Sequence, residues 1–103
     1  MMESIFKNQI VLFKIKTHLT AAYVKDLVIK TKKELEHYQD YQGVEIDLSQ
    51  AHNIDSMGIT FLIGVYKTVS AEGKTFKVLG VSDAMLQLFA IMKLDEIFEI
   101  EKA

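Results

Sequence analysis

A single hydroxyl-bearing residue stands at a point of the chain where it could carry chemistry. The order Asp55-Ser56-Met57-Gly58 leads into an apolar segment with helical spacing, so Ser56 lies at the predicted start of a helix. The first N–H groups of a helix lack internal partners, and the helix dipole places partial positive charge there. A phosphate is tolerated at such an end, which makes Ser56 a candidate phosphoacceptor. Because Asp and Ser are also preferred N-cap residues, a purely structural capping role stays open.

Other residue types that carry chemistry are sparse. The chain has no cysteine, which excludes disulfides, thiolate metal sites and a cysteine nucleophile. Its histidines, His18, His37 and His52, lack the spacing of metal ligands or of a catalytic base. The sequence also lacks a phosphate-binding loop and a kinase signature. We therefore expect no enzyme activity, no metal site and no cofactor, with Ser56 acting as a substrate for another enzyme.

Length and composition predict one globular domain spanning residues 1–103. The chain is 50% hydrophobic and 25% charged, as in ordinary folded domains, and it is long enough for one core. A net charge of −2 indicates no basic surface for nucleic acid or anionic lipid. No apolar run approaches the roughly 18 residues of a membrane span, and no secretory signal is visible. We expect a cytoplasmic protein that binds another protein, and neither nucleic acid nor membrane directly.

The N-terminal half predicts two strands and a helix. β-rich runs over residues 4–6 and 10–15 flank a short polar connection, which predicts a hairpin. Apolar residues then recur at helical spacing from Thr20, the predicted N-cap. The predicted apolar side of this helix consists of Val24, Leu27, Val28, Thr31, Leu35 and Tyr38.

The C-terminal half alternates strands and helices. Residues 44–48 alternate with period two, which places Glu45 and Asp47 on the face opposite the apolar residues. A second helix is predicted over residues 56–71, ended by Gly73. Three further segments follow: a strand over residues 75–79 closed by Gly80, a helix capped by Ser82, and a short strand or packed tail over residues 97–100.

The order of these elements predicts an α/β fold. Strands that alternate with helices are joined by right-handed crossovers in a largely parallel sheet, and the N-terminal hairpin adds one antiparallel pair. We expect a mixed, mostly parallel sheet with the helices packed on it. In open sheets of this kind functional groups gather beyond the carboxyl ends of the strands, and the predicted position of Ser56 is at such an end.

The predicted helix over residues 56–71 is unusually apolar. Its hydrophobic residues cover an arc of roughly 240°, about twice the stripe that a helix on one side of a sheet requires. Either neighbouring helices cover the surplus, or the part near Met57 and Phe61 forms a partner interface. Gly58 and Gly64 each cost about 1 kcal/mol relative to alanine in a helix. Close approach of another surface accounts for them, from within the domain or from a partner.

Several segments together resemble the STAS domain, in particular the bacterial anti-sigma factor antagonists. The resemblance covers nearly the whole chain and rests on Val44-Glu45-Ile46-Asp47-Leu48, Ile54-Asp55-Ser56-Met57-Gly58-Ile59, Gly64-Val65-Tyr66, Gly73-Lys74-Thr75 and Leu94-Asp95-Glu96-Ile97-Phe98. It implies a single STAS domain in which Ser56 is the phosphorylation site. The chain departs from the family pattern at Met57, where Ser or Thr is usual, and at Thr17-His18-Leu19-Thr20, where a Gly-Glu-Leu-Asp-like turn is usual.

The resemblance implies a partner-switching mechanism. The unmodified domain would bind an anti-sigma factor that is also a serine kinase, which frees the sigma factor. Phosphorylation of Ser56 would break the complex, and a metal-dependent serine phosphatase would restore it. The implied partner-binding residues are Asp47, Asp55, Met57, Gly58 and Phe61; the two aspartates either orient Ser56 or brace the loop as caps. The alternative is a STAS subunit of a lipid-transport or stress-sensing assembly that does not cycle phosphate.

Overall fold

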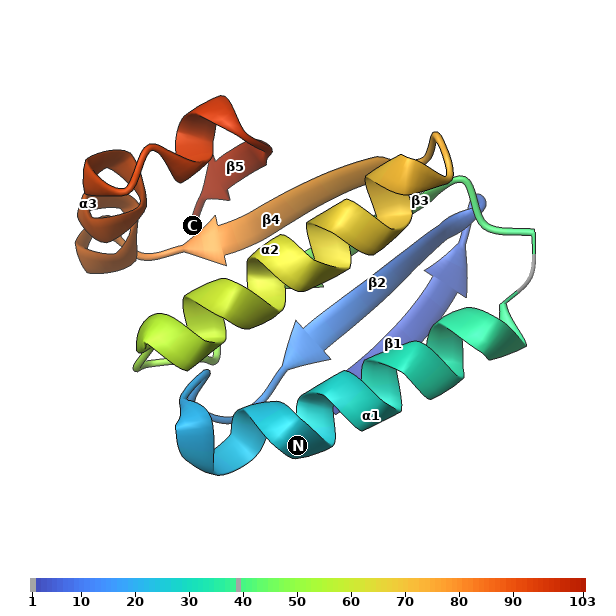
Figure 1. Cartoon of the computed structure of the whole chain (residues 1–103), viewed down its shortest axis with the longest axis horizontal. Coiled ribbons are helices and arrows are strands. Elements are labelled where there is room, and N and C mark those ends of the chain that lie inside the picture. Colours follow the sequence, from blue (N-terminus) through green and yellow to red (C-terminus); the bar gives the residue numbers. More distant parts are fainter. Residues whose placement is uncertain (1, 39) are drawn as a thin grey trace.

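The computed structural model describes residues 2–38 and 40–103 (Figure 1). Within these residues the elements follow one another as β1 (Met2–Lys7), β2 (Ile10–Ile15), α1 (Ala21–His37), β3 (Gly43–Asp47), α2 (Ser56–Ala71), β4 (Thr75–Val81), α3 (Asp83–Ile91), the 3-10 helix η1 (Leu94–Glu96) and β5 (Glu99–Lys102). This order agrees with the predicted alternation of strands and helices, and the C-terminal segment forms a strand.

The strands form one mixed sheet in the order β1-β2-β3-β4-β5. β1 and β2 are antiparallel, and each later pair of neighbours is parallel. Asn8 and Gln9 connect β1 to β2 with positive φ angles of 52° and 67°, as a two-residue hairpin turn with φ above zero at both positions requires. The predicted hairpin and the predicted mostly parallel α/β architecture are therefore confirmed.

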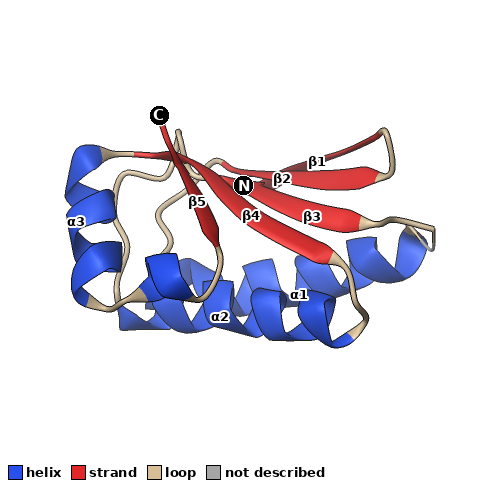
Figure 2. Ribbon diagram, turned by 90° about the horizontal axis from the view of Figure 1, so that it is seen from above, coloured by secondary structure: helices blue, strands red, loops and turns tan. Residues whose placement is uncertain are grey.

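The helices α1 and α2 lie side by side on one face of the sheet, and α3 lies at one end of it (Figure 2). The main core fills the space between that face and the two helices. It is built from side chains that alternate along the strands and from the inner side of each helix, including Val11, Phe13, Ile15, Val44, Ile46, Leu27, Leu62, Val65 and Val69. α1 and α2 run in the same direction, so their N-terminal ends lie together where the parallel strands end (Figure 1).

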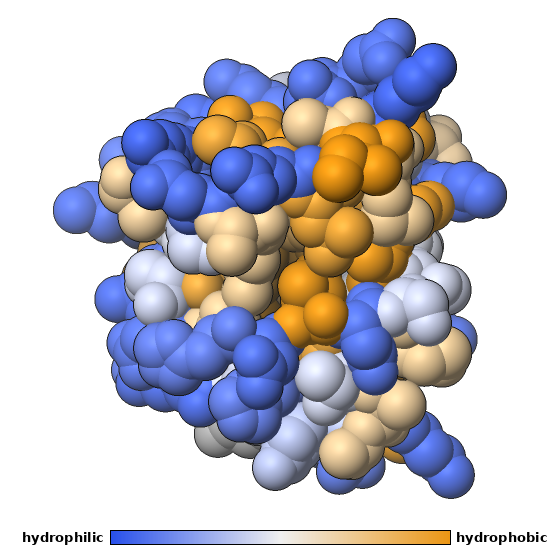
Figure 3. Space-filling view, turned by 90° about the vertical axis from the view of Figure 1, so that its left-hand side faces the viewer, coloured by the Kyte–Doolittle hydropathy of each residue, from blue (hydrophilic) through white to orange (hydrophobic). Residues whose placement is uncertain are grey.

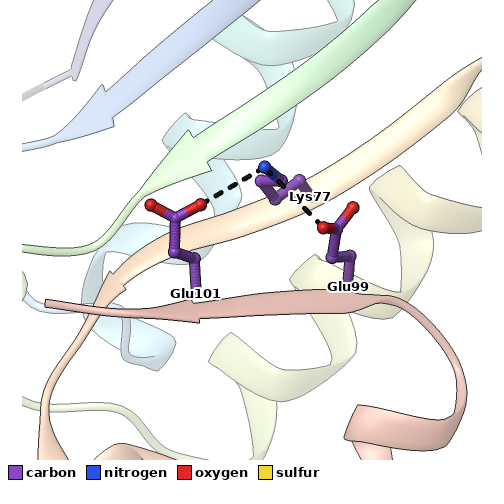
Figure 4. A network of polar contacts seen from close by, with 3 residues as sticks. All are labelled: Lys77, Glu99 and Glu101. Carbon is purple, nitrogen blue, oxygen red and sulfur yellow. Dashed lines mark hydrogen bonds and ion pairs between the residues drawn. The ribbon is translucent and has the colours of Figure 1, made fainter.

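The opposite face of the sheet carries charged side chains. Lys77 of β4 lies between two acidic residues of β5, with its Nζ 3.2 Å from Glu101 Oε2 and 3.8 Å from Glu99 Oε1 (Figure 4). The hydrogen bond to Glu101, together with the negative charge of Glu99, raises the pKa of Lys77. A sheet with a polar second face needs a helical layer on one side only, which explains the arrangement in Figure 2.

Three aromatic rings join the C-terminal segment to the rest of the fold. The ring centroid of Phe98 lies 5.2 Å from that of Phe76 in β4 and 5.8 Å from that of Tyr66 in α2. Phe98 is buried, as is Leu94 in η1. Edge-to-face and tilted ring pairs at such distances are favourable beyond the area they bury, so they hold β5 and η1 against α2 and β4.

Helix boundaries follow the sequence closely. α2 spans Ser56–Ala71 as predicted, and Gly73 beyond it has φ 73°, the left-handed conformation that glycine adopts without strain. Ser82 caps α3, because its Oγ accepts the N–H of Met85 at 3.3 Å.

Two expectations about individual residues are wrong. Gly80 does not close β4, which continues to Val81. Gly80 instead has φ 69° inside the strand, where the pairing with β5 shifts register, and this marks a bulge that only a glycine adopts readily. Val28, expected on the buried side of α1, is 45% exposed, because it lines a groove between α1 and α2 and does not face the sheet.

Candidate functional site

Asp55 occupies the N-cap of α2. Its backbone is extended, with φ −122° and ψ −173°, which leaves the side chain free to turn back onto the helix start. Its Oδ1 accepts the N–H of Met57 at 2.9 Å and that of Gly58 at 3.0 Å. Two of the N–H groups that the helix geometry leaves unsatisfied are thereby paired, and the capping interpretation of Asp55 is confirmed.

The same carboxylate also holds the start of α1. Its Oδ2 accepts the N–H of Ala21 at 2.9 Å, across 34 residues of sequence. Thr20 stands at the N-cap position of α1 as predicted, but among the described residues its hydroxyl makes no capping hydrogen bond. The predicted capping by Thr20 is therefore wrong, because Asp55 provides the oxygen that pairs with the first N–H group of the helix.

The chain segments around Asp55 are tied together by backbone hydrogen bonds. The N–H of Leu19 donates to the carbonyl of Asn53 at 2.8 Å, and the N–H of Asp55 donates to the carbonyl of Leu19 at 3.2 Å. The backbone N–H groups of Ala21 and Gly58 donate hydrogen bonds to the carboxylate, and these bonds, that of Ala21 most strongly, hold the pKa of Asp55 below its usual value. Asp55 is therefore ionised near neutral pH and acts as a fixed negative charge.

Ser56 is the first residue of α2 and is exposed to solvent. Its carbonyl accepts the hydroxyl of Thr60 at 2.9 Å, one turn along the helix. The two Asp55 oxygens already accept N–H groups from the first turns of both helices, those of Met57, Gly58 and Ala21, so the Ser56 side chain lies beside an occupied cap.

Gly58 is buried beneath this corner. A Cβ atom there would overlap the carbonyl oxygen of Leu19 and lie 2.8 Å from Cγ1 of Ile54. Close approach within the domain, one of the two expected explanations for this glycine, is therefore confirmed. Gly58 allows the strand-like segment before α1 to pass directly over the start of α2.

Met57 and Phe61 differ in exposure. Met57 is 47% exposed, whereas Phe61 is only 4% exposed and lies between α1 and α2. Seen from the end that carries α3 and the start of α2, apolar side chains form a band among hydrophilic ones (Figure 3). Most large apolar residues of α2 are buried by neighbouring elements, namely Ile59, Phe61, Leu62, Val65 and Val69. Met57 is the large apolar side chain at the start of the helix that remains accessible.

Asp47 ends β3 next to Lys14 in the sheet register, and its Oδ1 accepts the N–H of Ser49 at 2.9 Å. The same oxygen packs against Gly80, where a Cβ atom would lie 2.5 Å from it. The structure thus gives Asp47 a bracing role at the start of the loop to α2. Asp55, Ser56, Met57 and Gly58 follow one another at the start of α2, and the hydrogen bond from Ala21 to Asp55 adds the start of α1 to this corner.

Sequence reasoning did not foresee two features of this region. The bond from Asp55 to the start of α1 joins residues far apart in sequence, for which no local pattern exists. The contribution of α1 to the groove between α1 and α2 was not predicted either, although the sequence pointed to its α2 side through the apolar residues Met57 and Phe61 and through Gly64. In the described part of the chain no three acidic or histidine side chains gather to hold a metal ion. Nor does any helix there have both the length and the hydropathy to cross a bilayer.

Comparison with known proteins gives consistent matches. The domain family described as "Mlab, STAS domain" matches residues 6–100. Anti-sigma-B factor antagonists from Listeria monocytogenes and Listeria innocua are each 34% identical over 74 residues, which is 70% of this chain. The match spans 65% of the length of these relatives.

Solved structures share the fold at low sequence identity. A STAS domain protein from Planctomyces limnophilus superposes with a TM-score of 0.81 at 17% identity, covering 99% of this chain and 90% of that one. The Bacillus protein SpoIIAA in its phosphorylated form gives 0.75 at 13% identity, covering 100% and 92%. The family match over residues 6–100, together with this architecture, shows that the chain belongs to the STAS domain family.

Proposed function

We propose that the chain is an anti-sigma factor antagonist that is switched by phosphorylation of Ser56. The names of its Listeria relatives support the antagonist role. The observation that carries the proposal is the exposed position of Ser56 as the first residue of α2, directly beside the Asp55 cap. In its unmodified form the protein binds an anti-sigma factor that is also a serine kinase, and this releases the sigma factor.

The charge at this corner explains how a phosphate would act as a switch. Asp55 already places an ionised carboxylate at the joined helix ends, and a phosphate on Ser56 adds about 1.5 to 2 further negative charges. The helix dipole makes this tolerable within the domain. In a protein interface the same charges cost desolvation and like-charge repulsion, and a loss of about 3 kcal/mol weakens binding more than a hundredfold.

The chain acts as a substrate in this cycle. The partner kinase supplies ATP and Mg²⁺, and a metal-dependent serine phosphatase removes the phosphate, both in the cytoplasm. Asp55 holds Ser56 in place as a positioning residue through the cap that it forms. Met57 is the accessible apolar contact next to the acceptor.

Phosphoryl transfer tests the proposal directly. The chain is incubated with each anti-sigma factor kinase from its own genome and MgATP, and its intact mass is measured. We expect one phosphoryl group on the wild type and none on Ser56→Ala. Ser70→Ala is the control, because Ser70 is an exposed hydroxyl residue near the far end of the same helix, and this variant should be phosphorylated like the wild type.

Absence of phosphate transfer from every such kinase would overturn the switching mechanism and favour the non-cycling STAS subunit instead. A second readout is affinity for the kinase, measured by calorimetry. Ser56→Ala should bind as the wild type does, whereas Ser56→Asp should bind more weakly because its carboxylate stands beside that of Asp55. Equal affinities of the two variants would contradict the electrostatic mechanism.

A further inference from the structure

An apolar groove runs along the outer side of the molecule between α1 and α2. Its volume is about 380 Å³, within the range of protein binding sites. The lining residues come from both helices: Val24, Val28, Thr31, Lys32 and Leu35 from α1, and Met57, Thr60, Phe61, Gly64, Val65 and Thr68 from α2. The groove therefore begins beside Ser56, through Met57 and Thr60, and follows α2 away from it.

Gly64 forms a notch in the wall of this groove. It is exposed, and no described atom beyond its own helix backbone and adjoining residues comes within 4 Å of the position that a Cβ would take. Glycine in a helix costs about 1 kcal/mol relative to alanine. Unlike Gly58, Gly64 has no packing within the described structure that requires this residue, so a surface from outside the chain accounts for it.

Two threonines extend the notch along the helix. Thr60 and Thr68 stand one turn before and one turn after Gly64. Their hydroxyls donate to carbonyls of α2 itself, Thr60 to Ser56 at 2.9 Å and Thr68 to Gly64 at 3.0 Å. Because these polar groups are already paired, the groove presents small, largely apolar side chains. Small residues one turn apart let another helix backbone approach closely.

The position of the groove identifies its occupant. A standard interface buries about 800 Å² on each partner, which corresponds to a patch about 16 Å in radius. From Ser56 to Gly64 the helix rises about 12 Å at about 1.5 Å per residue. A kinase whose active site reaches Ser56 therefore also covers the first turns of α2 and the near part of the groove.

Charge and shape both disfavour a second copy of the chain as the occupant. In an isologous dimer the same surface faces itself, and two facing grooves leave a void. Lys32 is the one charged residue lining the groove in the described structure, so a symmetric pair brings two cations together. A partner that presents apolar residues and one acidic residue can fill the apolar groove and also pair its carboxylate with Lys32.

We infer that the groove between α1 and α2 is the docking site for an amphipathic helix of the anti-sigma factor kinase, with an acidic residue of that helix directed at Lys32. This inference rests on the proposed function, because the kinase is the partner that must cover Ser56. Helix-in-groove recognition uses apolar anchors spaced along one helix face, and the length of the lined groove fits about three helical turns. Docking there adds affinity at a distance from the phosphoacceptor.

Filling the notch tests the docking site. Gly64→Gln places a long, helix-favouring side chain where the structure has open space, so the melting temperature should not fall. We expect the Kd for the purified kinase, measured with a non-hydrolysable ATP analogue, to rise at least tenfold. Ser70→Gln introduces the same side chain at an exposed position of α2 outside the groove and should leave the Kd unchanged.

Charge reversal provides a second test with its own control. Lys32→Glu should weaken binding at least fivefold, and Lys33→Glu, its neighbour on the other side of α1, should not. For both groove variants the Michaelis constant for phosphorylation of Ser56 should rise while kcat stays within twofold, because the groove binds the kinase without touching the reacting atoms.

The outcomes separate the two proposals. If wild type and both groove variants bind equally well and wild type is phosphorylated, the docking site is wrong and the proposed function stands. If wild type neither binds nor is phosphorylated by any such kinase, both are overturned. Sedimentation that shows a wild-type dimer dispersed by Gly64→Gln, with unchanged kinase affinity, would assign the groove to a second copy and also overturn the inference.

Discussion

At the scale of single residues, Asp55 connects two helices through one carboxylate. One oxygen accepts the N–H groups of Met57 and Gly58, and the other accepts that of Ala21. An asparagine offers one accepting oxygen where two are needed, so Asp55→Asn must leave one helix start unpaired. We expect a lower melting temperature at pH 7 for Asp55→Asn, whereas Asp26→Asn, at an exposed position of α1, should have little effect.

The pH dependence of this difference follows from the direction of the pKa shift. Hydrogen bonds from Ala21 and Gly58 lower the pKa of Asp55 in the folded state. The unfolded state therefore takes up its proton first, at a pKa of about 3.9. The stabilisation is complete above that pH and is lost as the pH falls through the lower folded pKa. The melting-temperature gap between wild type and Asp55→Asn should shrink below about pH 4, and a gap independent of pH would contradict the charged cap.

The two helix glycines give opposite predictions for the same substitution. Gly58→Ala forces a Cβ into the carbonyl of Leu19, and backbone cannot move aside cheaply, so we expect a loss of about 1 to 3 kcal/mol in the free energy of unfolding. Gly64→Ala enters open space and should gain up to about 1 kcal/mol from helix propensity. Urea unfolding of both variants measures the change in the free energy of unfolding. Equal changes in the two variants would show that the contacts around Gly58 do not make it less tolerant of alanine than Gly64.

At the scale of elements, local signals predicted most of the fold. The bounds of α2 follow from Asp55 as the cap and Gly73 beyond the end, and the face of β3 that carries Glu45 and Asp47 follows from strict alternation. Structural features that depend on contacts between distant segments could not be predicted from local sequence patterns. Gly80 lies at the register shift with β5 and packs against Asp47 of another strand, and α1 is capped across 34 residues.

The candidate site likewise has some features that the sequence predicts and others that it does not. The position and exposure of Ser56 follow from its place between a cap and an apolar helix. The exposure of Val28 depends on where α2 lies relative to α1, which no periodicity within α1 reveals.

The C-terminal elements depend on one aromatic side chain. Phe98 is buried against Phe76 and Tyr66, and truncating a buried aromatic residue typically costs 3 to 5 kcal/mol, roughly the scale expected for Phe98→Ala. Ile97→Ala, at an exposed neighbouring position, should change stability by less than about 0.5 kcal/mol. Thermal and urea unfolding check both, and a mild effect of Phe98→Ala would mean that β5 and η1 hold to the fold by other contacts.

At the scale of the whole molecule, the proposed switch should act through the surface and leave the fold unchanged. Ser56 is exposed, and the N–H groups of Met57 and Gly58 beside it are already paired with Asp55. The phosphorylated chain should therefore keep its secondary structure, with amide chemical shifts changing mainly near the starts of α1 and α2. Shift changes that extend into β4 and β5 would instead indicate a rearrangement of the fold.

The order of the strands in the sheet is also their order along the chain. During synthesis each new strand can therefore join the free edge left by its predecessor, and no earlier pairing has to open to admit it. Domains generally fold as units during synthesis, beginning from the N-terminal side. The first N–H group of α1 is the exception, because its acceptor, Asp55, leaves the ribosome 34 residues after Ala21. Completion of the corner that presents Ser56 is thus delayed until the middle of the chain has been made.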